Sequence, residues 1–229
     1  MQSEQKSSWQ IFLEHLFFCA IAGGMIYLPM TLTPFQRHDD YLLASYNPVN
    51  DIRKYEGYTS MVGSGRFLLA EITHPLFYPV YAKYVYNSGF FIGLRLLNLI
   101  FLILAFSLFS LWMTKVLLMD KIISGLISIL LLTLPGFQFL AAQAVAATNV
   151  WCIPLAMASV LILDDGRRLI SFKVIFRQPA RIAISLFLLL ITLFTYQTYI
   201  LVFLWPSLSL LIFAERSTWP WKDGSLSGT

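Results

Sequence analysis

Long apolar stretches without any charged residue alternate with polar segments along this chain of 229 residues. Four stretches stand out, at 16–36, 96–114, 122–163 and 182–214. A membrane-spanning helix needs about 20 mainly apolar residues. The first, second and fourth stretches therefore each predict one span, and the length of the first favours a retained helix over a cleaved signal peptide.

The third stretch is too long for one helix. Its 42 residues would form a helix of about 63 Å, roughly twice the hydrocarbon thickness of a bilayer. We expect two helices, with a turn in the small and polar segment 141–149 and a bend at Pro135-Gly136.

The pattern predicts an all-α, polytopic membrane protein with about five transmembrane helices in a single membrane domain, residues 1–229. The predicted spans are approximately 16–36, 94–114, 121–140, 146–164 and 182–213. A long outward loop, residues 34–88, would join the first two spans.

Composition supports this class. Hydrophobic residues make up 58% of the chain and charged residues only 12%, about half of the usual charged share of roughly 25%. This excludes a water-soluble enzyme and a disordered chain. Cys19 and Cys152 lie in apolar stretches, which predicts buried free thiols. The net charge of +4 is more typical of membrane topology than of nucleic-acid binding.

The basic residues predict the orientation. The segment 164–181 carries five basic residues and two acidic ones, and Lys115 and Lys121 fall on the same side as the N-terminus. Basic loops favour the cytoplasm. We expect a multi-pass protein of the bacterial inner membrane with a cytoplasmic N-terminus, a cytoplasmic basic loop at 164–181 and the loop 34–88 facing outward.

The outward loop holds eight of the eleven tyrosines, with five basic and five acidic residues. Tyrosine rings prefer the headgroup region of a bilayer. The loop either lies along the membrane surface or uses some of its rings to stack on a sugar. A helical pattern at 66–72 suggests short interfacial helices within the loop.

The pair Asp39-Asp40 follows the first span directly, within Arg37-His38-Asp39-Asp40-Tyr41. Two adjacent carboxylates at a membrane face are costly to desolvate, so one of them can serve as a base or bind a divalent cation. A plain surface pair is the alternative, as we expect for Asp164-Asp165-Gly166 in the basic loop.

Other polar residues are candidates with ordinary alternatives. Arg66, in a Gly-rich turn, and Arg95, near the outer end of the second span, either hold a phosphate or point into solvent. His38 and His74 are expected to be simple loop residues. Asn98, Gln143, Asn149 and Gln197 are expected to form hydrogen bonds between helices.

These features together resemble the GtrII-like glucosyltransferases, bacterial and phage membrane enzymes similar in plan to the GT-C class of glycosyltransferases. The likeness lies in a first span followed by Asp39-Asp40, then Gly65-Arg66 before an apolar helix, then a series of membrane helices with Tyr196-Gln197 in the last. Members of that family are longer, so the chain resembles their N-terminal half.

The resemblance implies a glycosyltransferase that moves glucose from undecaprenyl-phosphate glucose, a polyprenyl-phosphate-linked sugar, to the O-antigen of lipopolysaccharide on the periplasmic side. Asp39 or Asp40 would be the catalytic base or would be a carboxylate that contacts a divalent cation as cofactor. Candidate substrate contacts are Arg66, Arg37, Tyr41 and Arg95.

Two alternatives stay open. The chain is a truncated, non-catalytic membrane remnant or assembly partner, or it is a small lipid-carrier flippase or transporter. A coupled transporter needs an ionisable group deep inside a span. None of the four charge-free stretches contains one, which counts against this class.

Overall fold

The computed structural model describes residues 7–33, 66, 68, 71, 88–143, 146–147, 149–163 and 179–195. The regular structure of these residues is entirely helical, which confirms the predicted class. Their helices are α1 (Ser8–Leu32), α5 (Ser88–Lys115), α6 (Lys121–Leu132), α7 (Pro135–Ala142), α8 (Cys152–Leu163) and α10 (Pro179–Thr195).

Two helices, α1 and α5, are each long and apolar enough to cross a membrane, which indicates a membrane protein. Both begin before the charge-free stretches that predicted them, and α1 ends at Leu32 rather than 36. Helix α1 begins at Ser8 rather than 16, because Ser7 and Gln10 form a reciprocal capping box there. Helix α5 begins at Ser88 rather than 94. Two residues that flank the stretches, His15 and Arg95, therefore lie inside helices.

The long third stretch is broken, as expected. Helices α6 and α7 are bent by 65° at their junction, where Pro135 is the first residue of α7. Proline suits the first turn of a helix but cannot extend an earlier one. The predicted span 121–140 is therefore a bent pair rather than one straight helix, and the chain turns again between α7 and α8.

By length and composition, two helices of the described residues can cross a membrane, or three if the bent pair counts as one span. Helices α8 and α10 are apolar but shorter, with 12 and 17 residues. Helix α8 starts at Cys152 rather than 146 because the turn takes those residues. The predicted fifth span extends to 213, and residues beyond 195 lie outside the described residues, as does nearly all of the loop 34–88.

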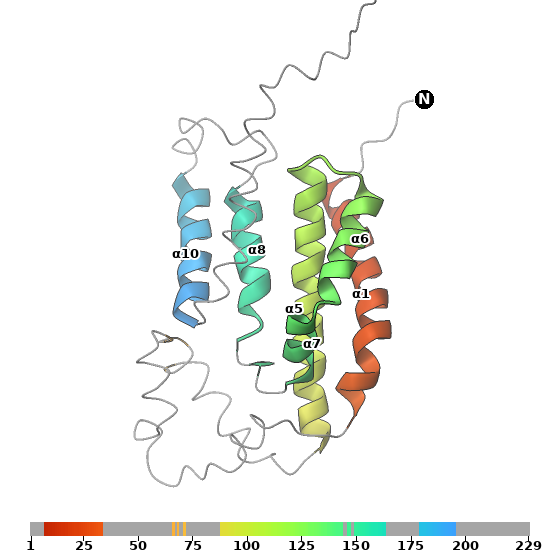
Figure 1. Ribbon diagram of the computed structural model, residues 1–229. Helices are drawn as coiled ribbons and strands as arrows, with labels where there is room; N and C mark the ends of the chain where they lie inside the picture. The colour runs from red at the N-terminus through yellow and green to blue at the C-terminus, as the bar shows by residue number, and fades with distance from the viewer. Residues whose placement is uncertain are drawn as a thin grey trace, which may run out of the picture.

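Helix α5 lies at the centre of the bundle and packs against α1, α6, α7 and α8, while α10 packs against α8 (Figure 1). Helices α1 and α5 run in opposite directions. The start of α1 meets the end of α5, and the end of α1 meets the start of α5. We call these two places the His15 end and the Arg95 end of the bundle.

Helix α1 buries one narrow stripe against its neighbours, formed by His15, Cys19, Gly23, Tyr27 and Thr31 at every fourth position. At Gly23 an added Cβ would lie 3.0 Å from Ile103 Cγ1, so glycine permits the close approach of α1 and α5. The hydroxyl of Tyr27 donates to the Leu132 carbonyl at the end of α6. Cys19 and Cys152 are buried free thiols, as predicted.

Candidate functional site

The structure describes two of the six predicted site residues, Arg66 and Arg95. Arg37, Asp39, Asp40 and Tyr41 lie outside the described residues, as do His38 and His74. Arg66 is described and half-buried. Arg95 is the predicted site residue whose surroundings the structure defines, so the Arg95 end is the candidate functional site.

Arg95 is fully buried, with an exposed fraction of 0%. Its guanidinium donates a hydrogen bond from NH1 to the carbonyl of Thr33, the residue that caps the C-terminus of α1, at 2.8 Å. The partial negative charge at a helix C-terminus stabilises a nearby cation. Of the two alternatives for Arg95, a side chain that points into solvent is therefore wrong. The side chain ties α5 to the point where the chain leaves α1 for the segment 34–88.

Asn98 lies one turn further along α5 and is equally buried. Its Nδ2 donates to two carbonyls at the end of α7, those of Leu140 at 3.1 Å and Gln143 at 2.6 Å. The predicted hydrogen bond between helices is confirmed for Asn98. Two successive polar residues of α5 thus hold the C-terminal ends of two different helices, α1 and α7.

The turn between α7 and α8 is buried rather than exposed. Its described residues include the buried Gln143, Ala146, Ala147 and Val150. The backbone N–H groups of Ala146 and Val150 donate within the turn, to Gln143 O at 3.2 Å and Ala146 O at 2.8 Å. Asn98 supplies donors to carbonyls at the start of the turn. A buried polar backbone needs such partners.

This turn lies within the depth of the bilayer if α5 crosses it. Helix α5 has 28 residues, which gives about 42 Å against about 30 Å of hydrocarbon. An upright, centred α5 would put Asn98, ten residues after Ser88, about 9 Å below the hydrocarbon boundary. Non-helical backbone at that depth is tolerated only where protein or a water-filled cavity surrounds it.

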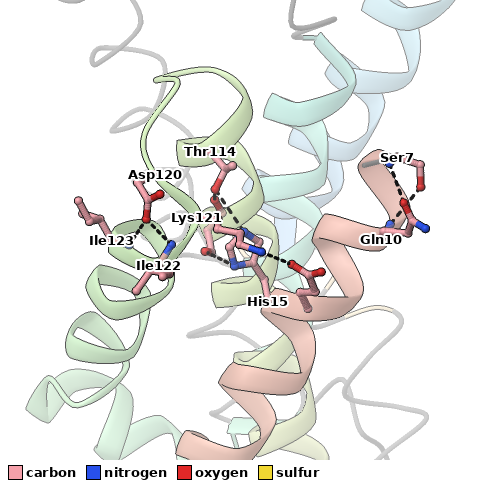
Figure 2. A network of polar contacts seen from close by, with 10 residues as sticks. Ser7, Gln10, His15, Thr114, Asp120, Lys121, Ile122 and Ile123 are labelled. Carbon is pink, nitrogen blue, oxygen red and sulfur yellow. Dashed lines mark hydrogen bonds and ion pairs between the residues drawn. The ribbon is translucent and has the colours of Figure 1, made fainter. Parts of the chain in front are cut away.

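A second polar cluster lies at the His15 end (Figure 2). The His15 ring is 3% exposed. Its Nδ1 lies 2.9 Å from Ser110 Oγ and its Nε2 lies 3.2 Å from Thr114 Oγ1, both on α5. Gly125 on α6 lies beside the ring, where an added Cβ would make an ordinary van der Waals contact with Nδ1 at 3.9 Å.

The hydrogen bonds indicate which tautomer a neutral His15 ring adopts. Thr114 donates its hydroxyl hydrogen to the Ser110 carbonyl at 3.0 Å, so its oxygen can only accept from Nε2–H. A neutral ring then accepts at Nδ1 from the Ser110 hydroxyl. This arrangement uses every donor once and corresponds to the neutral Nε2–H tautomer.

Charged groups surround this cluster toward the helix termini. Lys121 Nζ lies 3.1 Å from Glu14 Oε2, and the Lys115 ammonium donates to Ser8 Oγ. Burial of His15 was not predicted, because the residue immediately precedes the first charge-free stretch, 16–36. The four-residue spacing with Cys19, Gly23 and Tyr27 is the signal that identifies it.

No three His, Cys, Asp or Glu side chains of the described residues converge to bind a metal ion, and the carboxylates predicted for a cation, Asp39 and Asp40, lie outside this part. Comparisons with models of protein families, with curated proteins and with solved structures found no match. The GtrII-like resemblance therefore stays a prediction from the sequence.

Proposed function

We propose that this chain forms the membrane part of a glycosyltransferase that moves glucose from undecaprenyl-phosphate glucose to O-antigen, on the periplasmic side of a bacterial inner membrane. The observation that carries the proposal is Arg95, a fully buried guanidinium bound to Thr33, the residue that caps the C-terminus of α1. A buried charge within a membrane helix is costly and usually has a function.

The position of Arg95 connects it with the predicted catalytic segment. The bound carbonyl belongs to Thr33, six residues before Asp39 in the sequence. A lipid-linked donor carries its phosphate at the membrane face, where a fixed positive charge raises the local concentration of anions and stabilises a leaving phosphate. Arg37 and Arg66 would add to this potential, and Tyr41 would stack on the sugar.

The proposed reaction is a single displacement. An acceptor hydroxyl attacks the anomeric carbon, its proton passes to Asp39 or Asp40, and the bond between that carbon and the phosphate oxygen breaks with its electron pair staying on the phosphate. The leaving group needs charge stabilisation rather than a proton. A divalent cation on Asp39 and Asp40 remains a prediction from the sequence.

The test is incorporation of labelled glucose from the lipid-linked donor into O-antigen by membranes that contain this chain. We expect Asp39→Asn or Asp40→Asn to abolish transfer at unchanged membrane abundance. The matched control is Asp164→Asn with Asp165→Asn, the other acidic pair, which should keep transfer. Full activity in both Asp39 and Asp40 variants would remove the pair from the mechanism, and an inserted but inactive wild type would favour a remnant or assembly partner.

One observation favours a second candidate, a lipid-carrier flippase coupled to protons. His15 is an ionisable group buried inside α1, whereas the charge-free stretches contain none. Both ring nitrogens contact hydroxyls of α5. These contacts explain the buried ring as a structural link between two helices, without a role in proton transfer, and this favours the transferase. Proton-driven movement of the lipid donor in vesicles, lost in His15→Phe, would favour the flippase instead.

A further inference from the structure

The turn between α7 and α8 has an unusual place in the bundle. It departs from helical conformation at a depth where lipid offers no hydrogen bonds, yet most of its described residues are buried, and Asn149 and Trp151 are half-buried. Its backbone is satisfied partly by its own short-range bonds and partly by one side chain of another helix, Asn98 of α5.

The orientation of the Asn98 amide follows from these contacts. Nδ2 faces the carbonyls of Leu140 and Gln143, and a flipped amide would place oxygen against two oxygens. Oδ1 is buried with no hydrogen-bond partner. The amide therefore contributes as a double donor at this position, since its acceptor is unused.

Asn98 and Arg95 are three residues apart on α5, and side chains at this spacing lie on the same helix face, about 5–6 Å apart at Cβ. Arg95 fixes the end of α1, and Asn98 fixes the end of α7 and the start of the turn. The same face of α5 thus sets the relation between the segment that leads to Asp39 and the non-helical turn.

We propose that Asn98 is a positioning residue for the transferase site: it holds the α7–α8 turn within the membrane, on the face of α5 that also carries Arg95. This inference rests on the proposed function. The turn would then fix how deeply the phosphate of the lipid-linked sugar sits relative to Arg95.

The two native thiols report on the turn. Cys152 begins α8 directly after the turn, and its N–H bonds to the Asn149 carbonyl within it. Cys19 lies in the middle of α1. Both are buried, so a thiol reagent reaches each one only when its surroundings open. Peptide mass spectrometry separates the two sites.

The experiment compares maleimide labelling of wild type, Asn98→Leu, Asn98→Ser and Ser159→Ala in membranes. Asn98→Leu removes both donors at similar volume, whereas Asn98→Ser keeps one. Ser159→Ala is the matched control, because the buried Ser159 hydroxyl bonds to Ala156 O within its own helix. We expect Asn98→Leu to raise the Cys152 rate at least about tenfold with Cys19 unchanged, Asn98→Ser to raise it less, and Ser159→Ala to change neither.

Transfer kinetics add a measurement that loss of stability alone would not move. A displaced α7–α8 turn would misplace the reacting atoms, and a misplacement of about 1 Å can cost up to about 100-fold in rate. We expect Asn98→Leu to lower kcat about 10- to 100-fold, with the KM for the lipid-linked donor changed less than about threefold. Asn98→Ser should recover part of the rate.

The results that overturn the inference are specific. Unchanged Cys152 protection in Asn98→Leu shows that Asn98 does not hold the turn. An exposed Cys152 with normal kcat shows that the turn is no part of the site. Equal exposure of Cys19 and Cys152 in both Asn98 variants makes Asn98 a residue of general stability. An inactive wild type removes the proposed function, and the thiol comparison still decides whether Asn98 holds the turn.

Discussion

The two ends of the bundle are both polar, but they are built differently. At the His15 end, side chains of α1 bond to side chains of α5 and α6: His15 to Ser110 and Thr114, and Glu14 to Lys121. At the Arg95 end, side chains of α5 bond to backbone carbonyls at the ends of α1 and α7.

The two ends therefore have different roles. At the His15 end side chains connect complete helices, which we call a joint, and at the Arg95 end side chains bind backbone at helix ends, which we call a holder. Bonds between side chains of regular helices fix the distance between helices that are complete in themselves. Bonds from side chains to carbonyls compensate for backbone that has left the helix, and they fix where a chain segment starts. The Arg95 end is therefore built to position non-helical segments, which is what a site in a membrane protein needs.

The largest effect is expected at the Arg95 end. Arg95→Ala removes a fully buried side chain and leaves the Thr33 carbonyl without its charged donor, so we expect a loss of about 3–4 kcal/mol in the free energy of unfolding. Arg95→Met fills most of the space and should lose about 1–2 kcal/mol. Unfolding in mixed micelles measures both values.

The difference between the two Arg95 variants separates packing from hydrogen bonding. A loss under about 1 kcal/mol in Arg95→Ala would contradict the role of Arg95 in holding the end of α1. It would show that neither the cavity nor the unsatisfied Thr33 carbonyl lowers the free energy of unfolding. Equal losses in both variants would instead assign the whole effect to the charged hydrogen bond.

At the His15 end we expect an intermediate effect. His15→Phe keeps the ring volume but removes both nitrogens, which should cost about 1–2 kcal/mol because Ser110 and Thr114 lose one partner each. A double-mutant cycle with Ser110→Ala in the same micelles measures the coupling. Additive losses in the cycle would mean that the two residues do not interact and that the joint lies elsewhere.

Between the two ends, adjacent glycines of α1 offer a matched pair. An added Cβ at Gly23 meets Ile103 at 3.0 Å, whereas one at Gly24 has no atom within 4 Å. We expect Gly23→Val to be less stable than Gly24→Val by about 1–2 kcal/mol, because overpacking separates α1 from α5. Equal stability of the two variants would show that the His15 end and the Arg95 end set the distance between α1 and α5, and that the buried stripe of α1 around Gly23 does not.

The sequence predicted the helical class, the bend at Pro135 and the turn before Cys152, because each depends on local rules: apolar length, proline geometry and small polar residues. It did not predict where α1 and α5 begin. Helix α1 begins at the Ser7–Gln10 capping box, before His15, and α5 begins before Arg95. Both residues are buried by other helices, and a charge-free stretch counts such residues as boundaries. Burial of a polar side chain is a property of its partners, which one sequence does not display.

The candidate site follows the same logic. Asp39 and Asp40 were selected for their position after an apolar stretch, and their role remains a prediction. Asn98 was predicted only to bond between helices. That its partners are the carbonyls of a turn at membrane depth follows from the packing of α7 on α5, which no spacing within either helix specifies.

The smallest effect is expected for Glu14 and Lys121, the ion pair at the margin of the His15 end. Their side chains are 32% and 48% exposed, and such pairs contribute about 0.2–1 kcal/mol because water screens them and both side chains lose freedom. A cycle of Glu14→Gln and Lys121→Gln should give a coupling of about 0.5 kcal/mol that vanishes near 1 M salt, where the Debye length is about 3 Å. The His15–Ser110 coupling joins neutral, buried groups and should not change with salt. If salt weakens both couplings equally, the ring of His15 carries a charge and the joint is electrostatic, which would remove the distinction between the two ends.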